Sequence, residues 1–563
     1  MSKKPYLTAA SLALAALLSQ PVHADGRDDH DRIHHVLLLS IDGMHAVDYE
    51  NCIVGGYCPN LAALGTTGVR YTRTSTSRPS DSFPGLMALV SGGSPKTVGA
   101  YYDVAYDRVL APPQHDTGNG VAGGVCNPGV ANGTTTEYEE GVDIDQTKLN
   151  GGGPYSSTDG GIKSIDPARL PRDPFDSCKP VYPWNFVRTN TIFGVIHAAR
   201  GYTAWSDKHP VYAAVSGPSQ NAGNVDDYYS PEINSKVVAL TGVTTATNIP
   251  CSPIRDTTQV GSWTDSFENI QCYDALKVNA ILNEIGGRTH DGLRHAPVPT
   301  LFGMNFQAVS VGQKLIENGN LIGGYTDAAG TPTSLLQDEI GFVDASIGQM
   351  VASLRSRGLV DSTLIVVTAK HGQSPIDPAR FFPIPGHGGT NGTSPANWIA
   401  GYLPFSESPA NPTGIGPTED DISLLWLAHS SDTLAAVGVL EANAASAGIG
   451  QIFYGPSLET MFNAPGLPPL GDPRSPDIIV QPNVGVVYTG SSKKQAEHGG
   501  FAQDDTNAML LVSNPAMEPG VVTSFVETSQ VAPTILKALA LDPRALEAVR
   551  KEGTPVLPGL FSR

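Results

Sequence analysis

The chain has 563 residues, of which 35 are basic and 54 acidic, and its formal net charge is −19. Such a charge repels polyanions, so we expect no nucleic-acid partner and no attraction to an anionic membrane surface. A small anionic substrate remains compatible with it, because a metal ion or a lysine reverses the field locally.

The N-terminus has the pattern of a secretory signal peptide over residues 1–24. Lys3 and Lys4 precede an apolar run from Leu7 to Leu18, and Val22-His23-Ala24 is a small-residue cleavage pattern. The apolar run is too short to span a bilayer comfortably. We therefore expect an exported protein, periplasmic or extracellular, that keeps no membrane anchor after cleavage.

The mature chain, residues 25–563, is long enough for several domains or for one large domain with insertions. Its first segment begins with the continuous apolar run Val36 to Leu39, followed by Ser40 and Ile41, and predicts a strand buried on both faces of a parallel sheet. Asp42 follows at the carboxyl end of this strand, where open α/β sheets gather functional side chains. A turn-capping role is the ordinary alternative for such an aspartate.

Six cysteines, an even number in an exported chain, predict disulfides, of which fifteen connectivities are formally possible. Proximity in the sequence favours the pairs Cys52–Cys58, Cys126–Cys178 and Cys251–Cys272.

Strands and helices alternate along the chain. Further strands are expected at residues 69–72, 300–305, 364–370 and 508–513, and helices at 61–64, 334–354, 433–445 and 530–540. This order favours one layered α/β domain. Gly/Pro/Asn-rich stretches at about 111–183 and 382–417 predict loop-rich insertions.

The segment Arg78 to Gly85 contains a candidate nucleophile, Ser82. Pro84 suits the first turn of a helix, so Ser82 is expected at or just before the helix N-terminus. A serine there is often only a cap. The free backbone N–H groups of that end also favour an anion, so a nucleophile would meet a phosphate in a positive field.

Two later segments place histidines beside glycines. They are Lys370-His371-Gly372, after an apolar strand, and His498-Gly499. Ser206-Asp207-Lys208-His209 follows another apolar run, and His209 is a possible pocket residue, although a supporting or surface position is favoured. Asp338, Glu339 and Asp344 fall on a helical period and are expected on its solvent-facing side.

Together the segments around Asp42, Ser82, His371 and His498 resemble the type I phosphodiesterase and nucleotide pyrophosphatase branch of the alkaline phosphatase superfamily, from about Val36 to Pro533. The resemblance implies a three-layer α/β/α sandwich with a central, mostly parallel sheet. It also implies that Ser82 is the nucleophile and that Asp42, His371 and His498 bind a divalent metal, most readily Zn²⁺.

The sequence departs from that family at several positions. Val309 and Gln313 stand where members have the aspartate and histidine of an Asp-x-x-Gly-His motif, Lys370 replaces the aspartate of Asp-His-Gly, and Gly85 replaces an asparagine. Asn305, Gln307 and Gln313 are possible neutral ligands, which zinc binds weakly.

Three interpretations follow from these departures. In the first, a single ion is held by Asp42 and His371, with Ser82 or His498, while the Lys370 ammonium replaces the second cation as a catalytic group. In the second, other carboxylates substitute, with Asp420 and Asp421 as candidates, although a solvated turn explains that pair equally well. In the third, the site is inactive and the fold serves binding.

The leading hypothesis is metal-assisted hydrolysis of a small anionic phosphate ester, diester or monoester. A sulfatase-like hydrolase is a further alternative, but Ser77-Arg78-Pro79 does not supply that branch's activation motif. The oligomeric state is left open.

Overall fold

The structure is a computed structural model that describes Met1 and residues 33–118, 120–139, 141–149, 161–236, 240–253, 262–386, 392–404 and 418–561. The predicted signal peptide lies outside the described residues, as do parts of both predicted insertions. None of the described helices combines the length and the apolarity needed to cross a membrane.

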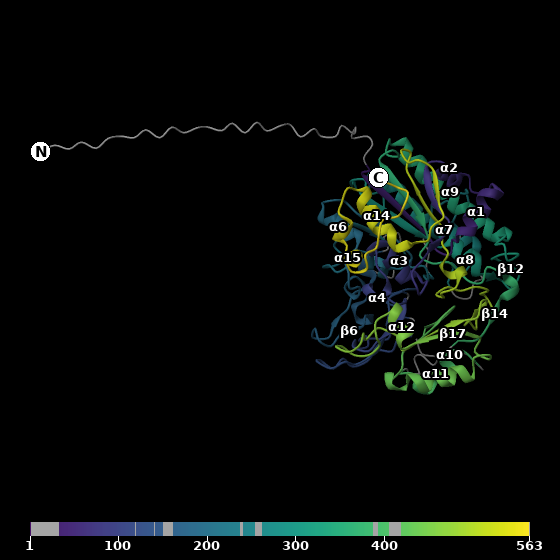
Figure 1. The fold of residues 1–563 in the computed structure, drawn as a ribbon. Coiled ribbons are helices and arrows are strands. Elements are labelled where there is room, and N and C mark those ends of the chain that lie inside the picture. The colour runs from purple at the N-terminus through teal and green to yellow at the C-terminus, as the bar shows by residue number, and fades with distance from the viewer. Residues whose placement is uncertain are drawn as a thin grey trace.

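The described residues form a central eight-stranded sheet (Figure 1). Its spatial order is β21 (Gly520–Val522), β2 (Gly68–Tyr71), β20 (Leu510–Ser513), β13 (Thr363–Thr368), β1 (His35–Ile41), β10 (Leu301–Phe306), β8 (Ala204–Ser206) and β9 (Asp227–Tyr229). Among these strands, β20 alone runs antiparallel to its neighbours. The predicted α/β fold with a mostly parallel sheet is confirmed.

Strand β1 is buried on both faces because its apolar run has no polar alternation. Val36 and Leu38 join one hydrophobic cluster, whereas Leu37 and Leu39 join another. Since successive side chains of a strand point to opposite faces, the two clusters are the two interfaces between the sheet and its helical layers. This arrangement is the predicted three-layer sandwich.

Each helical layer supplies the apolar faces that cover the sheet. The first cluster contains residues of α3 (Ser82–Ser91), α5 (Pro183–Phe186), α6 (Ile192–Ala198), α14 (Val531–Ala538) and α15 (Glu547–Glu552). The second contains residues of α1 (Ala46–Gly55), α2 (Pro59–Gly65), α7 (Phe267–Ile285), α8 (Ala308–Lys314) and α9 (Ser334–Ser356). Every residue of α3 is buried, which anchors the helix that carries Ser82.

A smaller sheet lies below the central one in Figure 1, with α11 (Thr433–Ala442) on its outer side. Its strand order is β15 (Thr418–Glu419), β16 (Ser423–Leu425), β18 (Ile478–Pro482) and β17 (Ile449–Tyr454). The other face of this sheet packs on Tyr101 and Tyr102, which follow the short helix α4 (Pro95–Val98). The smaller sheet is thereby joined to the loop that leaves α4.

The remaining described elements are short. They are the strand pairs β3 (Thr74–Ser75) with β22 (Val526–Glu527), β4 (Val104–Asp107) with β5 (Thr134–Glu137), β6 (Arg172–Asp173) with β7 (Lys179–Pro180), β11 (Ile316–Glu317) with β12 (Leu321–Ile322) and β14 (Phe382–Pro383) with β19 (Val486–Val487), and the helices α10 (Pro395–Trp398), α12 (Pro456–Met461) and α13 (Gln503–Thr506).

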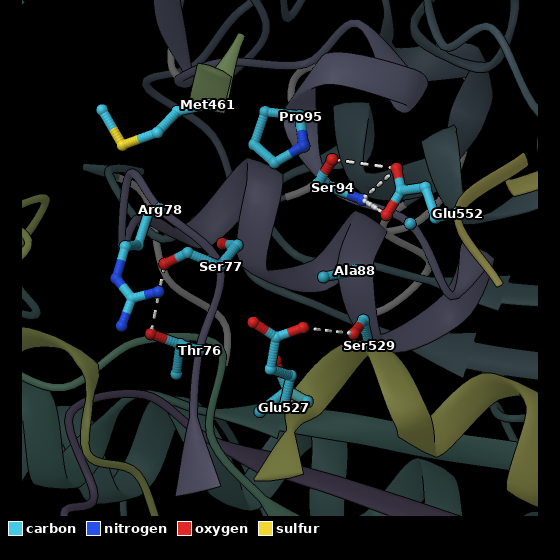
Figure 2. Close-up of a pocket in the computed structure, with 12 residues that line it drawn as sticks. Thr76, Ser77, Arg78, Ala88, Ser94, Pro95, Met461, Glu527, Ser529 and Glu552 are labelled. Carbon is cyan, nitrogen blue, oxygen red and sulfur yellow. Dashed lines mark hydrogen bonds between the residues drawn. The ribbon is translucent and has the colours of Figure 1, made fainter. Parts of the chain in front are cut away.

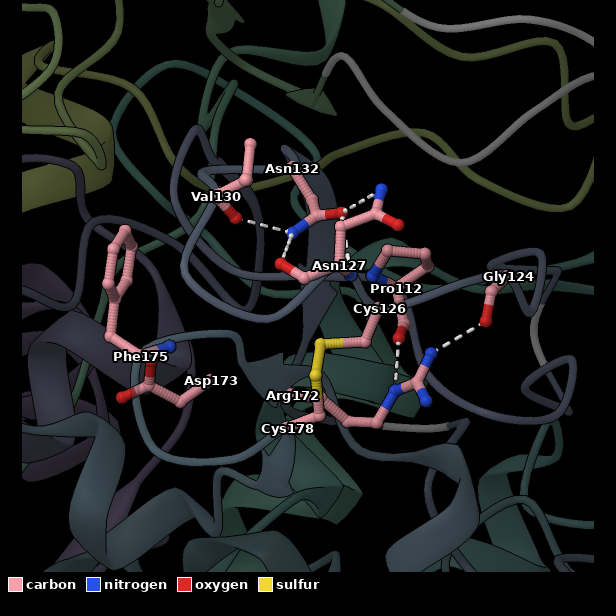
Figure 3. The surroundings of a disulfide bond; sticks show 10 residues. All are labelled: Pro112, Gly124, Cys126, Asn127, Val130, Asn132, Arg172, Asp173, Phe175 and Cys178. Carbon is pink, nitrogen blue, oxygen red and sulfur yellow. Dashed lines mark hydrogen bonds between the residues drawn. A yellow bond between two sulfur atoms is a disulfide. The ribbon is translucent and has the colours of Figure 1, made fainter.

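All three predicted disulfides are confirmed: Cys52–Cys58, Cys126–Cys178 and Cys251–Cys272. Figure 3 shows the second of these within the segment 111–183, where the Arg172 guanidinium also donates to the carbonyl groups of Pro112 and Gly124. The disulfide and these side-chain hydrogen bonds stabilise a segment that has little regular secondary structure. Three disulfides are typical of a protein that folds in an oxidising compartment.

The expectation for the acidic residues of α9 is wrong in part. Glu339 and Asp344 are 1% and 2% exposed, not solvent-facing. Asp344 accepts hydrogen bonds from the backbone N–H groups of Asn60 and Leu61, at 3.2 and 2.7 Å. Its carboxylate therefore satisfies the free N-terminus of α2, which explains its burial.

Candidate active site

Ser82 is the first residue of α3, as the sequence predicts. The preceding residue, Asp81, caps the helix by accepting a hydrogen bond from the Phe83 N–H at 3.1 Å. Burial and the nearby Glu139 raise the pKa of Asp81 to about 7. The Ser82 hydroxyl therefore lies at the positive end of a buried helix, an environment that favours an anion.

Three side chains from three strand ends converge on the Ser82 hydroxyl. His371 Nε2 lies 3.3 Å from Ser82 Oγ, Lys208 Nζ lies 3.1 Å from it and Asp42 Oδ2 lies 3.5 Å from it. These residues follow β13, β8 and β1, which are central strands of the sheet. The expectation that strand-end residues meet at one edge of the sheet accounts for this cluster.

The protonation of His371 follows from its hydrogen bonds. Its Nδ1 lies 2.8 Å from the carbonyl oxygen of Gly372, which can only accept, so Nδ1 carries the proton. In the neutral ring, Nε2 is then an acceptor directed at the Ser82 hydroxyl. The pair has the arrangement of a nucleophile and its general base.

Asp42 is fully buried and is fixed by neutral donors. Gln307 Nε2 and Asn305 Nδ2 donate to Asp42 Oδ2 at 2.6 and 3.1 Å. Burial opposes ionisation of this carboxyl, but the Lys370 and Lys208 ammonium groups lower its pKa well below the ordinary value. Asn305 and Gln307, predicted as possible ligands, thus bond Asp42 through their amide N–H groups.

The turn at Asp42 requires the glycine that follows it. Gly43 has a φ of +83°, in the left-handed region, and a Cβ there would lie 2.2 Å from Gln313 Oε1. Gln313 Nε2 donates to the Gly43 carbonyl and to the Tyr325 hydroxyl, each at 2.8 Å. Gln313 therefore packs behind the Asp42 turn, and its amide is bonded there.

Two ammonium groups lie in the site, each held by a carboxylate. Lys208 Nζ contacts Glu139 Oε1 at 2.5 Å, and Lys370 Nζ contacts Asp207 Oδ1 at 2.9 Å. Burial disfavours the Lys208 ammonium, but the carboxylates around it, Glu139 foremost, raise its pKa. Lys208 is therefore held as a cation, and the buried Lys370 is paired with the Asp207 carboxylate.

The sequence did not single out Lys208, although its position carried a signal. It follows the apolar strand β8, as Asp42 and His371 follow β1 and β13. Applying the strand-end rule to Ser206-Asp207-Lys208-His209 identifies both Asp207 and Lys208. Glu139 follows the short strand β5 by two residues, within the loop-rich segment, but β5 has no apolar run that would predict it.

His498 lies against His371, with a ring-centroid distance of 4.0 Å. Burial lowers the pKa of His498 well below its ordinary value, so the ring is neutral near pH 7. Its Nδ1 lies 3.6 Å from Asp81 Oδ1. The structure thus brings together Asp42, Ser82, His371 and His498, and adds Lys208.

The other candidates lie around this cluster. His209 Nδ1 contacts Glu232 Oε1 at 2.9 Å, in the buried layer behind Lys208. The Tyr102 hydroxyl lies 2.8 Å from Asp420 Oδ2 and 3.3 Å from the His498 carbonyl oxygen. Asp421 is buried, and burial and Asp505 raise its pKa well above the ordinary value, whereas Asp420 is half-buried. Both lie in the turn between β15 and β16, and only Asp421 is withdrawn from solvent.

The residues present do not fit the two-metal site of the family. Among the described residues, no group of three or more His, Cys, Asp and Glu side chains is placed to hold a metal ion. Zinc sites use at least three such ligands. The two ammonium groups also disfavour a metal ion, because they would repel it. Two unit charges of the same sign 4 Å apart repel by about 4 kcal/mol at an effective dielectric constant of 20, and the repulsion is twice as large when one of them is a divalent ion.

A separate cavity of about 190 Å³ lies elsewhere, among Thr76, Ser77, Arg78 and residues of other segments (Figure 2). The figure shows the Glu552 carboxylate bonded to Ser94, whose hydroxyl donates to it at 2.8 Å. Neither Ser82 nor Asp42 lines this cavity. The candidate chemistry therefore belongs to the Ser82 cluster.

A mostly parallel sheet, with a serine at the N-terminus of a buried helix and with an aspartate, a histidine and two lysines just after its strands, defines an α/β protein with a candidate active site. The family model described as type I phosphodiesterase / nucleotide pyrophosphatase matches residues 36–135 and 307–386. The chain therefore has the predicted resemblance to this branch of the alkaline phosphatase superfamily, and the matches support a phosphate-ester hydrolase.

Solved structures share the fold. An inactive variant of murine ectonucleotide pyrophosphatase/phosphodiesterase 5 in complex with AMP is 12% identical, with a TM-score of 0.50, and the match covers 91% of this chain and 96% of that one. The same murine protein, in a second structure, matches at 12% identity and a TM-score of 0.50 over 90% and 96% of the two chains. Among curated proteins, no sequence matches.

Proposed function

We propose that this protein is an exported hydrolase of phosphate esters, diester or monoester, with Ser82 as its nucleophile. The observation that carries the proposal is the position of the Ser82 hydroxyl, between the N-terminus of α3 and the unprotonated nitrogen of His371, 3.3 Å away. The AMP bound to the murine relative is a phosphate monoester, which is compatible with this substrate class.

In the first half of the reaction, Ser82 Oγ forms a bond to phosphorus while the bond from phosphorus to the leaving oxygen breaks. The Ser82 proton passes to His371 Nε2, and the leaving oxygen takes a proton from solvent. The N-terminal N–H groups of α3 favour the charge on the phosphoryl oxygens. The product is a phosphoserine at position 82.

In the second half, water attacks the phosphoserine and the bond from phosphorus to Ser82 Oγ breaks. His371 returns its proton to Ser82, and the proton lost by the water goes to solvent, which replaces the one taken by the leaving group. Protons therefore balance over one turnover, and His371 acts first as a base and then as an acid.

The test is hydrolysis of bis-p-nitrophenyl phosphate, p-nitrophenyl phosphate and p-nitrophenyl sulfate by the purified mature protein. Ser82→Ala is expected to lower kcat by roughly 1000-fold or more. Ser77→Ala, on the same loop, is the matched control and should keep wild-type activity. Activity that survives Ser82→Ala would remove the nucleophile assignment.

The same assay separates the rival functions. Preference for the sulfate ester would indicate a sulfatase-like enzyme. A folded protein that is inert on all three esters would indicate a binding protein that keeps the fold.

A further inference from the structure

The departures from the family pattern share one consequence, which is a change in the source of positive charge. Val309 is buried among apolar residues of the second helical layer, and Gln313 is bonded behind the Asp42 turn. Neither supplies a ligand near Ser82. Lys208, by contrast, places its ammonium group 3.1 Å from Ser82 Oγ, and Lys370 Nζ lies 2.9 Å from Asp207 Oδ1, in the residue that precedes Lys208.

Both ammonium groups are fixed in place before any substrate arrives. Lys208 Nζ bonds Ser82 Oγ at 3.1 Å and Glu139 Oε1 at 2.5 Å, and Lys370 Nζ bonds Asp207 at 2.9 and 3.2 Å. Asp207 is itself fixed by the Trp205 indole N–H at 2.9 Å. Preorganised charges of this kind stabilise a transition state without a cost of reorganisation.

Tyr212 joins the two lysines into one unit. The Lys370 ammonium lies 4.2 Å from the centre of the Tyr212 ring, and the Tyr212 hydroxyl donates to Glu139 at 2.8 Å. The ring face attracts a cation, and the hydroxyl orients the carboxylate that holds Lys208. One buried side chain therefore positions both cations.

From this geometry we infer that Lys208 and Lys370 supply the positive charge at Ser82, and that hydrolysis requires no divalent metal ion. The inference rests on the proposed function. Lys208 contacts the nucleophile directly and is assigned as a catalytic residue that neutralises charge on the phosphoryl oxygens. Lys370 is the second ammonium group of this unit, while Glu139, Asp207 and Tyr212 are positioning residues.

A single ion is the rival interpretation, and it has a geometric basis. Ser82 Oγ, Asp42 Oδ2 and His371 Nε2 are separated by 3.3 to 3.6 Å, close to the spacing of ligands around tetrahedral zinc. Asp42 Oδ2 already accepts from Gln307 and Asn305, and Lys208 contacts Ser82, whereas the buried Asp42 Oδ1 has no hydrogen-bond partner among the described residues and is the oxygen that a single ion would have to use. The experiment must therefore separate an ammonium site from a one-ion site.

The first measurement is metal dependence. The mature protein is dialysed against EDTA and dipicolinate, its metal content is determined by mass spectrometry, and hydrolysis of bis-p-nitrophenyl phosphate is measured before and after addition of Zn²⁺, Mn²⁺ or Mg²⁺. We expect activity within twofold of the untreated protein at a negligible metal content. Loss of a Ser82-dependent activity on chelation, with recovery on metal addition, would overturn this inference alone.

The second measurement is substitution of the lysines. Lys208→Met is expected to lower kcat by about 100-fold or more with a smaller effect on KM, and Lys208→Arg to retain more activity because it keeps the charge. Lys96→Met, at an exposed lysine of the short helix α4, is the control. A folded Lys208→Met variant with wild-type kcat would overturn the inference.

The two sets of results also separate this inference from the proposed function. If the lysine variants do not fold, the chelation experiment alone decides the metal question. If the protein is inert with and without added metals, the proposed function and the inference fail together.

Discussion

Gly85 allows α3 to approach the end of β13, and adding a methyl group there tests this contact. A Cβ at position 85 would lie 2.2 Å from the carbonyl oxygen of Lys370 and 2.8 Å from its carbonyl carbon. Favourable contacts between heavy atoms lie near 3.5 Å or beyond. Both atoms belong to the backbone, so no side-chain rotation relieves the overlap, and α3 or the strand end must move.

Gly341 is the matched control, because it lies within α9 and a Cβ there would meet no atom within 4 Å. Ala in place of Gly favours a helix by about 1 kcal/mol, so Gly341→Ala should be neutral or stabilising. Overpacking costs typically about 1–3 kcal/mol, so Gly85→Ala should be destabilised relative to this control by roughly 2 kcal/mol.

The assay is thermal unfolding of both variants and the wild type in the same buffer. For a chain of 563 residues, a change of about 2 kcal/mol corresponds to roughly 2 °C in Tm, since the entropy of unfolding scales with chain length. Gly85→Ala should also lower kcat, because the displaced backbone carries Lys370. A Gly85→Ala protein as stable as Gly341→Ala would refute the close approach.

Two further predictions concern stability. Burial opposes ionisation of Asp472, but two hydrogen bonds from Arg188, at 2.6 and 2.7 Å, lower its pKa from 3.8 to about 2. The ionised carboxylate therefore contributes about 2 kcal/mol to the free energy of unfolding above pH 4, and this contribution is lost as the pH falls toward 2. The Tm of the wild type should therefore decrease more than the Tm of Asp472→Asn between pH 5 and pH 2.5. An equal decrease of Tm in the two proteins would contradict this prediction. The chain-entropy model predicts a larger loss of stability for the disulfide that closes the longer loop. Replacing both cysteines of Cys126–Cys178, which are 52 residues apart, by Ser should destabilise the protein by about 4 kcal/mol. The same replacement in Cys52–Cys58, 6 residues apart, should destabilise it by about 2 kcal/mol. Equal losses of Tm in the two double variants would contradict that model.

The strands that position the site were predictable because they are buried on both faces. Runs such as Val36 to Ile41 and Leu364 to Thr368 have no polar alternation, and the structure forms strands there. Their ends then indicate where functional side chains lie, which identified Asp42 and His371. Ser82 was predictable from the proline that follows it in the first turn of α3.

Other features depend on contacts that sequence periodicity does not reveal. Helix α7 was not predicted, since its buried residues include Asp274 and Lys277, which pair with each other at 2.9 Å and so resemble a solvated face in the sequence. The carboxylate of Asp344 caps α2, a helix remote in the sequence. Buried charges with distant partners are therefore the main source of error.

The strand-end rule states where chemistry occurs, and it does not state which chemistry. Position 370 illustrates the distinction, because the backbone places this residue at the end of β13 whatever its side chain. An aspartate at this position is a ligand for a cation, whereas a lysine is itself a cation. The buried lysine is tolerated because its Nζ pairs with Asp207 Oδ1 at 2.9 Å. A buried ammonium group without a partner would move to solvent or lose its proton. Asp207 and Glu139 prevent this by pairing with the lysines, so they distinguish a site with a new source of charge from an inactive site. The pairing of both lysines is the physical reason to expect an active enzyme.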